Sequence, residues 1–122
     1  MSQYMLLLYA PEVDEAEEAE RWAQLPVWEE VTESLRQDGV LVSNGPLSPV
    51  DTATTVRVRD DAVELTDGPF AVTKEILVGY YLLDCPDLDG ALQAAARLPA
   101  AKYGSIEVRP LREMSDSSAS GS

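Results

Sequence analysis

The hydrophobic pattern along the chain predicts a single sheet with helices between its strands. Two segments, 4–9 and 76–83, are almost entirely apolar, so each predicts a strand that is buried on both faces. Two further strands are predicted at 40–43 and 105–109. A turn at Asn44-Gly45-Pro46 is expected to close the first of these, and Pro110 marks the end or an edge position of the second.

Between these strands, apolar residues recur at helical spacing. A first helical stretch is expected to open at Asp14 or Glu15, and Pro26 must break or restart it because proline has no N–H to donate. Gly39 marks its end, whereas a later helix is capped by Asp87 and terminated by Pro99. The apolar stripes are expected at Ala16, Ala19, Trp22 and Ala23, at Val27, Trp28, Val31 and Leu35, and at Leu88, Ala91, Leu92 and Ala95.

The segments 54–59 and 62–66 alternate between apolar and polar residues and predict a β-hairpin. A two-residue turn at Asp60-Asp61 would fix its register, because every facing pair is then of a favourable type. The expected pairs are Val58 with Val63, Arg57 with Glu64, Val56 with Leu65, and Thr55 with Thr66. Asp-Asp is a poorer type I′ turn than Asp-Gly, so a longer loop stays open as an alternative.

The resulting order, β-α-β-(β-β)-β-α-β, predicts an α+β fold of the ferredoxin-like kind. Two helices can cover one face of such a sheet, and the strands 4–9 and 76–83 carry large apolar residues on the other face too. A soluble monomer rarely exposes a patch of that size. We therefore expect a homodimer in which two sheets pack face to face about a two-fold axis.

Composition narrows the functional classes. The 122 residues are enough for one domain, expected at 1–112, followed by a Ser-rich tail at 113–122 that is expected to be disordered. The formal net charge of −13 argues against nucleic acid and against an anionic membrane as partners. Six of the acids fall between Glu12 and Glu20, and they are interpreted as a solvated helix face rather than a contact surface for a basic partner.

Several kinds of chemistry are missing from the residue inventory. The chain has no histidine and one cysteine, so no zinc site is expected, and no motif predicts a nucleotide or other cofactor. Cys85 lies at an apolar strand end and is interpreted as a small inert hydrophobe. The apolar run near the start spans only six residues, too few for a signal peptide or a membrane span, so we expect a cytoplasmic protein.

The loop Asp67-Gly68-Pro69-Phe70-Ala71-Val72-Thr73-Lys74-Glu75 is an unusual string. It resembles the signature of the DGPF proteins of the YCII-related family, in which an acid usually stands where this chain has Val72. The likeness spans about residues 3–110 and includes Tyr4-Met5-Leu6-Leu7, Gly79-Tyr80-Tyr81 and Pro99-Ala100-Ala101-Lys102-Tyr103-Gly104.

The resemblance implies a dimeric α+β barrel. Some relatives look like enzymes, including one that acts in chlorinated-aromatic breakdown with a proposed His–Asp pair, and others are encoded beside, or fused to, extracytoplasmic-function sigma factors. This chain has no histidine, so the His–Asp pair cannot be carried over.

The loop has two physical interpretations. Asp67-Gly68-Pro69 predicts a rigid reversal, because Gly68 can adopt positive φ and Pro69 fixes its own φ, and Phe70 would then plug against the sheet. In the structural interpretation Lys74 and Glu75 form a surface ion pair. In the functional interpretation the loop is a ligand-binding rim, with Lys74 as an anion-binding group and Asp67 or Glu75 as an acceptor.

Other candidates lie on the predicted strands. Tyr80 and Tyr81 must point to opposite faces, and the one in the barrel interior needs a polar partner. Glu107 or Arg109 could supply it, unless they form a cross-strand ion pair. The candidate ligand-binding residues are Asp67, Gly68, Pro69, Phe70, Thr73, Lys74, Glu75, Tyr80, Tyr81, Arg57, Glu107 and Arg109, with Tyr4 and Asn44 as further polar lining.

Three functions are consistent with this pattern. The favoured one is a homodimer that binds a small molecule in a cleft between helices, sheet and the 67–75 loop. The second is a cofactor-free lyase, isomerase or hydrolase that uses carboxylate and tyrosine groups. The third is an interaction module that regulates transcription through a sigma factor.

Overall fold

A computed structural model describes residues 2–113 of the chain. Four strands, β1 (Ser2–Pro11), β2 (Leu41–Pro46), β5 (Glu75–Cys85) and β6 (Ser105–Pro110), form one sheet in the order β2-β5-β1-β6. Each neighbouring pair is antiparallel, which is the ferredoxin-like α+β arrangement that the sequence predicts. Residues 114–122, most of the expected Ser-rich tail, lie outside the described residues.

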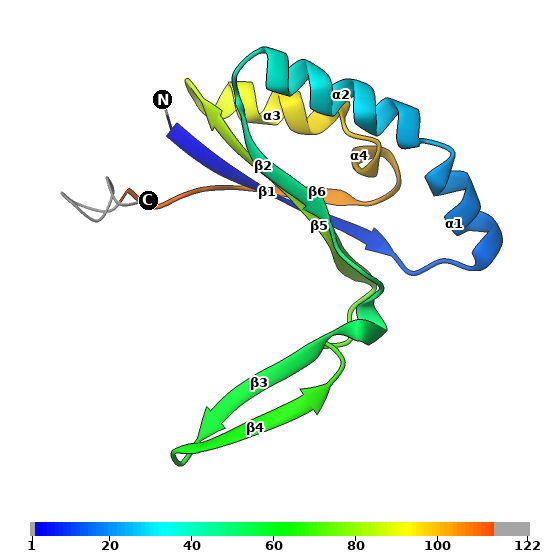
Figure 1. The fold of residues 1–122 in the computed structure, drawn as a ribbon, viewed down its shortest axis with the longest axis vertical. Helices are drawn as coiled ribbons and strands as arrows, with labels where there is room; N and C mark the ends of the chain where they lie inside the picture. Colours follow the sequence, from blue (N-terminus) through cyan, green and yellow to red (C-terminus); the bar gives the residue numbers. More distant parts are fainter. Residues whose placement is uncertain (1, 114–122) are drawn as a thin grey trace.

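The described residues contain four α-helices, all on one face of this sheet (Figure 1). They are α1 (Glu15–Trp22), α2 (Leu25–Gln37), α3 (Leu88–Arg97) and α4 (Ala100–Tyr103). The predicted caps are confirmed, because Asp14 accepts a hydrogen bond from the Glu17 N–H and Asp87 accepts one from the Gly90 N–H. Pro26 is the second residue of α2, so the helix restarts there as expected but begins one residue earlier, at Leu25. No helix in residues 2–113 combines the length and apolarity needed to cross a membrane.

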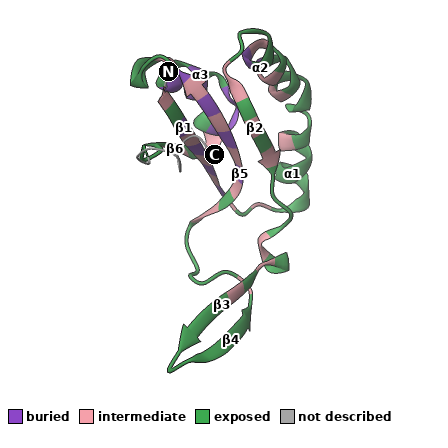
Figure 2. Cartoon of the chain, turned by 60° about the vertical axis from the view of Figure 1, so that its left-hand side comes forward, coloured by how far each residue is buried: buried purple, intermediate pink, exposed green. Residues whose placement is uncertain are grey.

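The predicted hairpin forms strands β3 (Thr54–Arg59) and β4 (Ala62–Asp67) with the expected register. Asp60 and Asp61 have φ of 50° and 63°, so a two-residue turn closes the hairpin and the longer loop is excluded. The two strands form a sheet of their own that projects away from the four-stranded sheet (Figure 1). We call this hairpin, residues 54–67, the arm. Its surface is almost entirely exposed (Figure 2).

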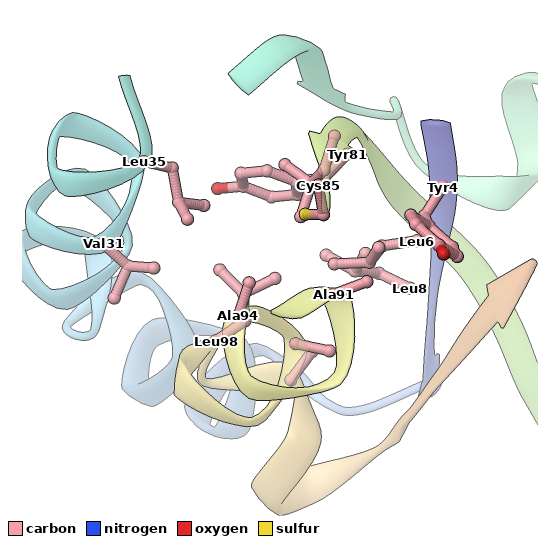
Figure 3. Close-up of a cluster of buried hydrophobic side chains, with 13 residues drawn as sticks. Tyr4, Leu6, Leu8, Val31, Leu35, Tyr81, Cys85, Ala91, Ala94 and Leu98 are labelled. Atoms are coloured by element: carbon pink, nitrogen blue, oxygen red, sulfur yellow. The ribbon is translucent and has the colours of Figure 1, made fainter. Parts of the chain in front are cut away.

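The core lies between the helices and the sheet. Alternate residues of the two central strands, among them Leu6 and Leu8 of β1 and Tyr81 and Cys85 of β5, point at the helices and are buried (Figure 3). The residues between them form the open face of the sheet, which no described segment covers. These are Met5, Leu7 and Tyr9 of β1 and Tyr80 and Leu82 of β5, all half-buried.

The structure corrects two expectations about the elements. Leu88 and Leu92 of α3 are 47% and 45% exposed, and the helix instead buries a row of alanines, with Ala94 in place of the leucines. Small side chains allow α3 to pack closely against the sheet. Asn44-Gly45-Pro46 is part of β2 rather than a turn, because β2 is an edge strand and an edge strand tolerates proline.

Three smaller corrections concern single residues and short helices. Val27 is 41% exposed and does not share the buried face of α2. Helix α4 and the 3-10 helix at Val50–Thr52 follow Pro99 and Pro49 and were not predicted from the sequence. Helix α1 buries none of its residues, so its acidic segment is a solvated helix face, as interpreted from the sequence.

We predict opposite effects for two glycine substitutions. A Cβ on Gly104 would collide with the carbonyl oxygen of Tyr9 and lie 2.9 Å from Ala10 Cα, so Gly104→Ala should cost about 3 kcal/mol of unfolding free energy. A Cβ on Gly90 would meet nothing nearer than 3.6 Å, and Gly90→Ala should stabilise α3 by about 0.5–1 kcal/mol. Urea unfolding of both variants tests the pair, and equal effects would contradict this account of the β1–α4 contact.

We also predict a protected thiol. Cys85 is 3% exposed, and burial, followed by the charges of Asp84 and Asp87, raises the pKa of its thiol. At pH 8 its reaction with a disulfide reagent should be at least about tenfold slower in the native protein than in the chain unfolded by guanidinium. Equal rates in the two states would contradict its interpretation as an inert core residue.

Candidate functional site

A large cleft opens on the helix-covered side of the sheet, between helices α1 and α2 and strands β2 and β5. Its volume is about 920 Å³, and we call it the helix-side cleft. A cleft of this size falls in the range of small-molecule sites. It is lined by Leu8, Ala10, Pro11, Glu12, Val13, Glu18, Arg21, Trp22, Leu25, Trp28, Glu29, Thr32, Glu33, Arg36, Asn44, Gly45, Pro46, Leu47, Pro49, Val50, Asp51, Ile76, Val78, Gly79, Tyr81 and Tyr103.

Aromatic side chains and one hydroxyl pair form part of the cleft lining. Trp28 of α2 and Tyr81 of β5 are stacked, with ring centroids 6.3 Å apart and planes at 17°. The Tyr81 hydroxyl lies 2.6 Å from the Thr32 hydroxyl, which satisfies its polar end inside the core. This pair joins α2 to the sheet. Tyr81 is therefore the tyrosine that faces the helices.

A cation already lies on an aromatic ring in this cleft. The guanidinium carbon of Arg21 is 4.5 Å from the centroid of the Tyr103 ring, and its Nη1 donates to the Pro11 carbonyl at 2.9 Å. Burial raises the pKa of the Tyr103 phenol, and the Arg21 charge partly offsets this rise. Arg21 thus ties α1 to the end of β1.

The formal charges of the cleft lining are predominantly negative. Five carboxylates line it, against two guanidiniums and no lysine. Arg36 is paired with Glu33, and Arg21 is held as described above. Glu12, Glu18, Glu29 and Asp51 form no ion pair within residues 2–113.

The 67–75 loop lines a second, smaller hollow of about 450 Å³, which we call the loop hollow. Four of the candidate residues meet there, namely Asp67, Gly68, Pro69 and Thr73. The remaining lining is Glu12, Val50, Asp51, Ala71, Val72 and Ile76. Glu12, Val50, Asp51 and Ile76 also line the helix-side cleft, so the two hollows are adjacent.

The loop itself is a rigid reversal, as predicted. Gly68 has a φ of 93°, which favours glycine, and its N–H donates to the Ala53 carbonyl at 2.7 Å. The Thr55 hydroxyl donates to the Gly68 carbonyl at 2.8 Å. These two bonds join the base of the arm to the start of the loop.

Three candidates from the loop do not contribute as expected. Phe70 is 78% exposed and lines neither hollow, so it is not a plug against the sheet. Lys74 and Glu75 also line neither hollow, and within the described residues they form no ion pair. Glu75 begins β5, where the Thr73 hydroxyl donates to its carbonyl. The surface ion pair expected between Lys74 and Glu75 is therefore wrong.

The remaining candidates lie away from both hollows. Tyr80 is on the open face, where the Ser43 hydroxyl donates to its hydroxyl at 3.3 Å. Glu107 and Arg109 form an ion pair at 3.2 Å along β6, and not the cross-strand pair that was considered. Strand β1 separates them from Tyr80, because Leu7 faces Tyr80 on one side and Glu107 on the other. Arg57 lies on the arm opposite Glu64. The predicted site residues therefore divide among four surfaces, namely the helix-side cleft, the loop hollow, the open face and the arm.

The helix-side cleft offers carboxyl, hydroxyl and guanidinium groups, and neither a thiol nor an imidazole lines it. The chain has no histidine, and the lone thiol of Cys85 does not line the cleft. No tyrosine lines the loop hollow beside Asp67. Among residues 2–113, no three Cys, Asp or Glu side chains are grouped so that they could hold a metal ion.

Sequence reasoning missed most of the cleft lining. Trp22 and Trp28 were assigned to helix faces, and Leu25 was not singled out. Of the two further candidates Tyr4 and Asn44, only Asn44 lines the cleft. One signal was available: two tryptophans fall six residues apart, on either side of the break at Pro26. A helix pair that bends there can turn both indoles toward one space.

Comparison with known proteins identifies relatives. The family model of the YCII-related domain matches residues 2–115. An uncharacterized protein of Rhizobium meliloti (strain 1021) is 49% identical over 67 residues, which are 53% of this chain and 54% of that relative. The chain therefore spans about half the length of this curated relative. Because the family model covers nearly the whole described chain, with the 67–75 loop inside the match, the protein belongs to the YCII-related domain family.

Proposed function

We propose that the protein is a homodimer that binds a small molecule in the helix-side cleft, beside the 67–75 loop. The observation that carries the binding proposal is the cleft itself, about 920 Å³ with four aromatic side chains on its walls. Binding sites for small molecules are typically concave and mostly apolar, with a few oriented polar groups. The Thr32 and Tyr81 hydroxyls and Asn44 supply such groups here.

The dimer proposal rests on the open face of the sheet. Met5, Leu7 and Leu82 give its centre an apolar surface that a monomer would leave wet. All described helices lie on the opposite face (Figure 1). A second copy packed against this face by a two-fold axis would bury the same residues in both subunits.

The arm supports the same conclusion independently. Val56, Val58, Val63 and Leu65 share one of its faces and are 57–68% exposed. A two-stranded ribbon has little stability in water without packing on one face. A second copy is the partner that would always be present to cover it.

Enzyme activity and association with a sigma factor stay predictions from the sequence, as does a cytoplasmic location. None of them is favoured by a contact in the described residues. Binding is the function that the cleft supports best.

We predict that one charge on the open face separates the subunits. Leu7 lies at its centre, and a glutamate there would be buried in the dimer but solvated in a single chain. Light scattering should give a dimer for the wild type and a single chain for Leu7→Glu. Leu92→Glu, on the exposed side of α3, is the matched control and should remain dimeric. A wild-type protein that scatters as one chain at micromolar concentration would refute the dimer.

We predict that ligand binding is reported by tryptophan fluorescence. Both tryptophans of the chain line the helix-side cleft, so a ligand there should change the emission while it raises the melting temperature. In a screen of a broad metabolite set, Trp22→Ala should weaken the binding of any hit by at least about tenfold.

The control for this screen is Lys74→Ala, because Lys74 lines neither hollow. It should bind each hit as the wild type does. A screen without a stabilising ligand would count against the proposed function, and a hit lost in Lys74→Ala but kept in Trp22→Ala would move the site to the loop.

A further inference from the structure

The walls of the helix-side cleft combine two properties that together select a ligand class. Trp22, Trp28 and Tyr103 present aromatic surface, and Leu25 adds aliphatic surface. The cleft therefore favours a ligand with an apolar body. Aromatic faces also carry negative potential, which attracts cations at close range.

The charged side chains that line the cleft also favour a cation. Glu12, Glu18, Glu29 and Asp51 line the cleft without an ion pair in the described part of the chain. Both guanidiniums are engaged, Arg36 with Glu33 and Arg21 with Pro11 and Tyr103. A carboxylate or phosphate ligand would therefore meet four carboxylates without an ion pair, against a single guanidinium without one, that of Arg21.

The protein shows within the cleft that an aromatic ring there can hold a cation. The Arg21 guanidinium lies over the Tyr103 ring at 4.5 Å. Trp22 is 61% exposed and Trp28 is half-buried, so their rings leave surface for a second cation from outside. The carboxylates that line the same cleft would also attract a cationic head placed there.

We propose that the ligand of this cleft is an organic cation, an amine or quaternary ammonium group on an apolar body. This inference rests on the proposed function and names its ligand class. The apolar body packs against the aromatic walls, and the cationic head lies toward the carboxylates of α1 and α2. A neutral molecule of the same shape gains only the packing against the aromatic walls. An anion is in addition repelled by the carboxylates.

A matched set of probes tests the charge preference. Benzyltrimethylammonium, its neutral isostere neopentylbenzene and the anion phenylacetate share a benzyl body and differ in charge. Tryptophan emission and melting temperature would be measured for each in phosphate buffer with 150 mM salt, which screens attraction to the surface as a whole. The cation should bind at least about tenfold more tightly than the other two.

Two double variants separate the cleft from general acidity, because the chain as a whole carries −13. Glu18→Gln/Glu29→Gln removes two cleft carboxylates and should weaken cation binding about fivefold to tenfold. Glu30→Gln/Glu64→Gln removes the same charge from α2 outside the cleft and from the arm, and should change binding less than about twofold.

The outcomes distinguish the two proposals. Cation preference lost only in the cleft variant supports the inference. Equal or tighter binding of the neutral or anionic probe overturns the cation preference and leaves the small-molecule cleft standing. Equal weakening by both double variants overturns it too, because the attraction would then be general. If no probe changes either signal, the ligand class is refuted, and the metabolite screen decides separately on the cleft.

Discussion

The central sheet can be covered by its own helices on one face only, and this constraint organises the whole molecule. Strands β1 and β5 are apolar on both faces, but each strand-to-strand crossover returns on the same side, so every described helix lies there. The covered face forms the core around Leu6, Leu83 and Leu98. The other face remains an apolar surface, and that surface is the physical reason to expect a second subunit.

The covered face is filled unevenly, and the cleft is a result of that. Helix α3 buries Ala91, Ala94 and Ala95, so its backbone approaches the sheet closely. On the other side, Trp28 and Tyr81 stack between α2 and β5 and hold helix and strand apart. The chain bends between α1 and α2 at Ala23 and Gln24, just before Pro26, and α1 buries none of its residues. The cleft lies on the α2 side of the sheet, where large aromatic rings stand in place of the alanines of α3.

Local rules predicted the elements well and the site poorly, for a physical reason. The arm register follows from facing pairs such as Arg57 with Glu64. The Asp14 and Asp87 caps follow because each carboxyl accepts a hydrogen bond from the N–H three residues later. Each of these depends on neighbours in sequence. Leu88 and Leu92 were placed in the core because leucine is apolar, whereas the distance between α3 and the sheet decides which face is buried. The same holds for Phe70 and Tyr81, whose surroundings come from segments far away in the chain.

The 67–75 loop has a different relation to the cleft from the one its sequence suggests. Its charged residues Lys74 and Glu75 do not reach the cleft, yet the wall formed by Val50, Asp51 and Ile76 is shared between the cleft and the loop hollow. The positive φ of Gly68 and its bond to Ala53 hold one end of the loop, and the start of β5 holds the other. Under the proposed function, the family signature would therefore border the cleft through this shared wall, while the aromatic side chains of α1 and α2 would make the contacts with the ligand.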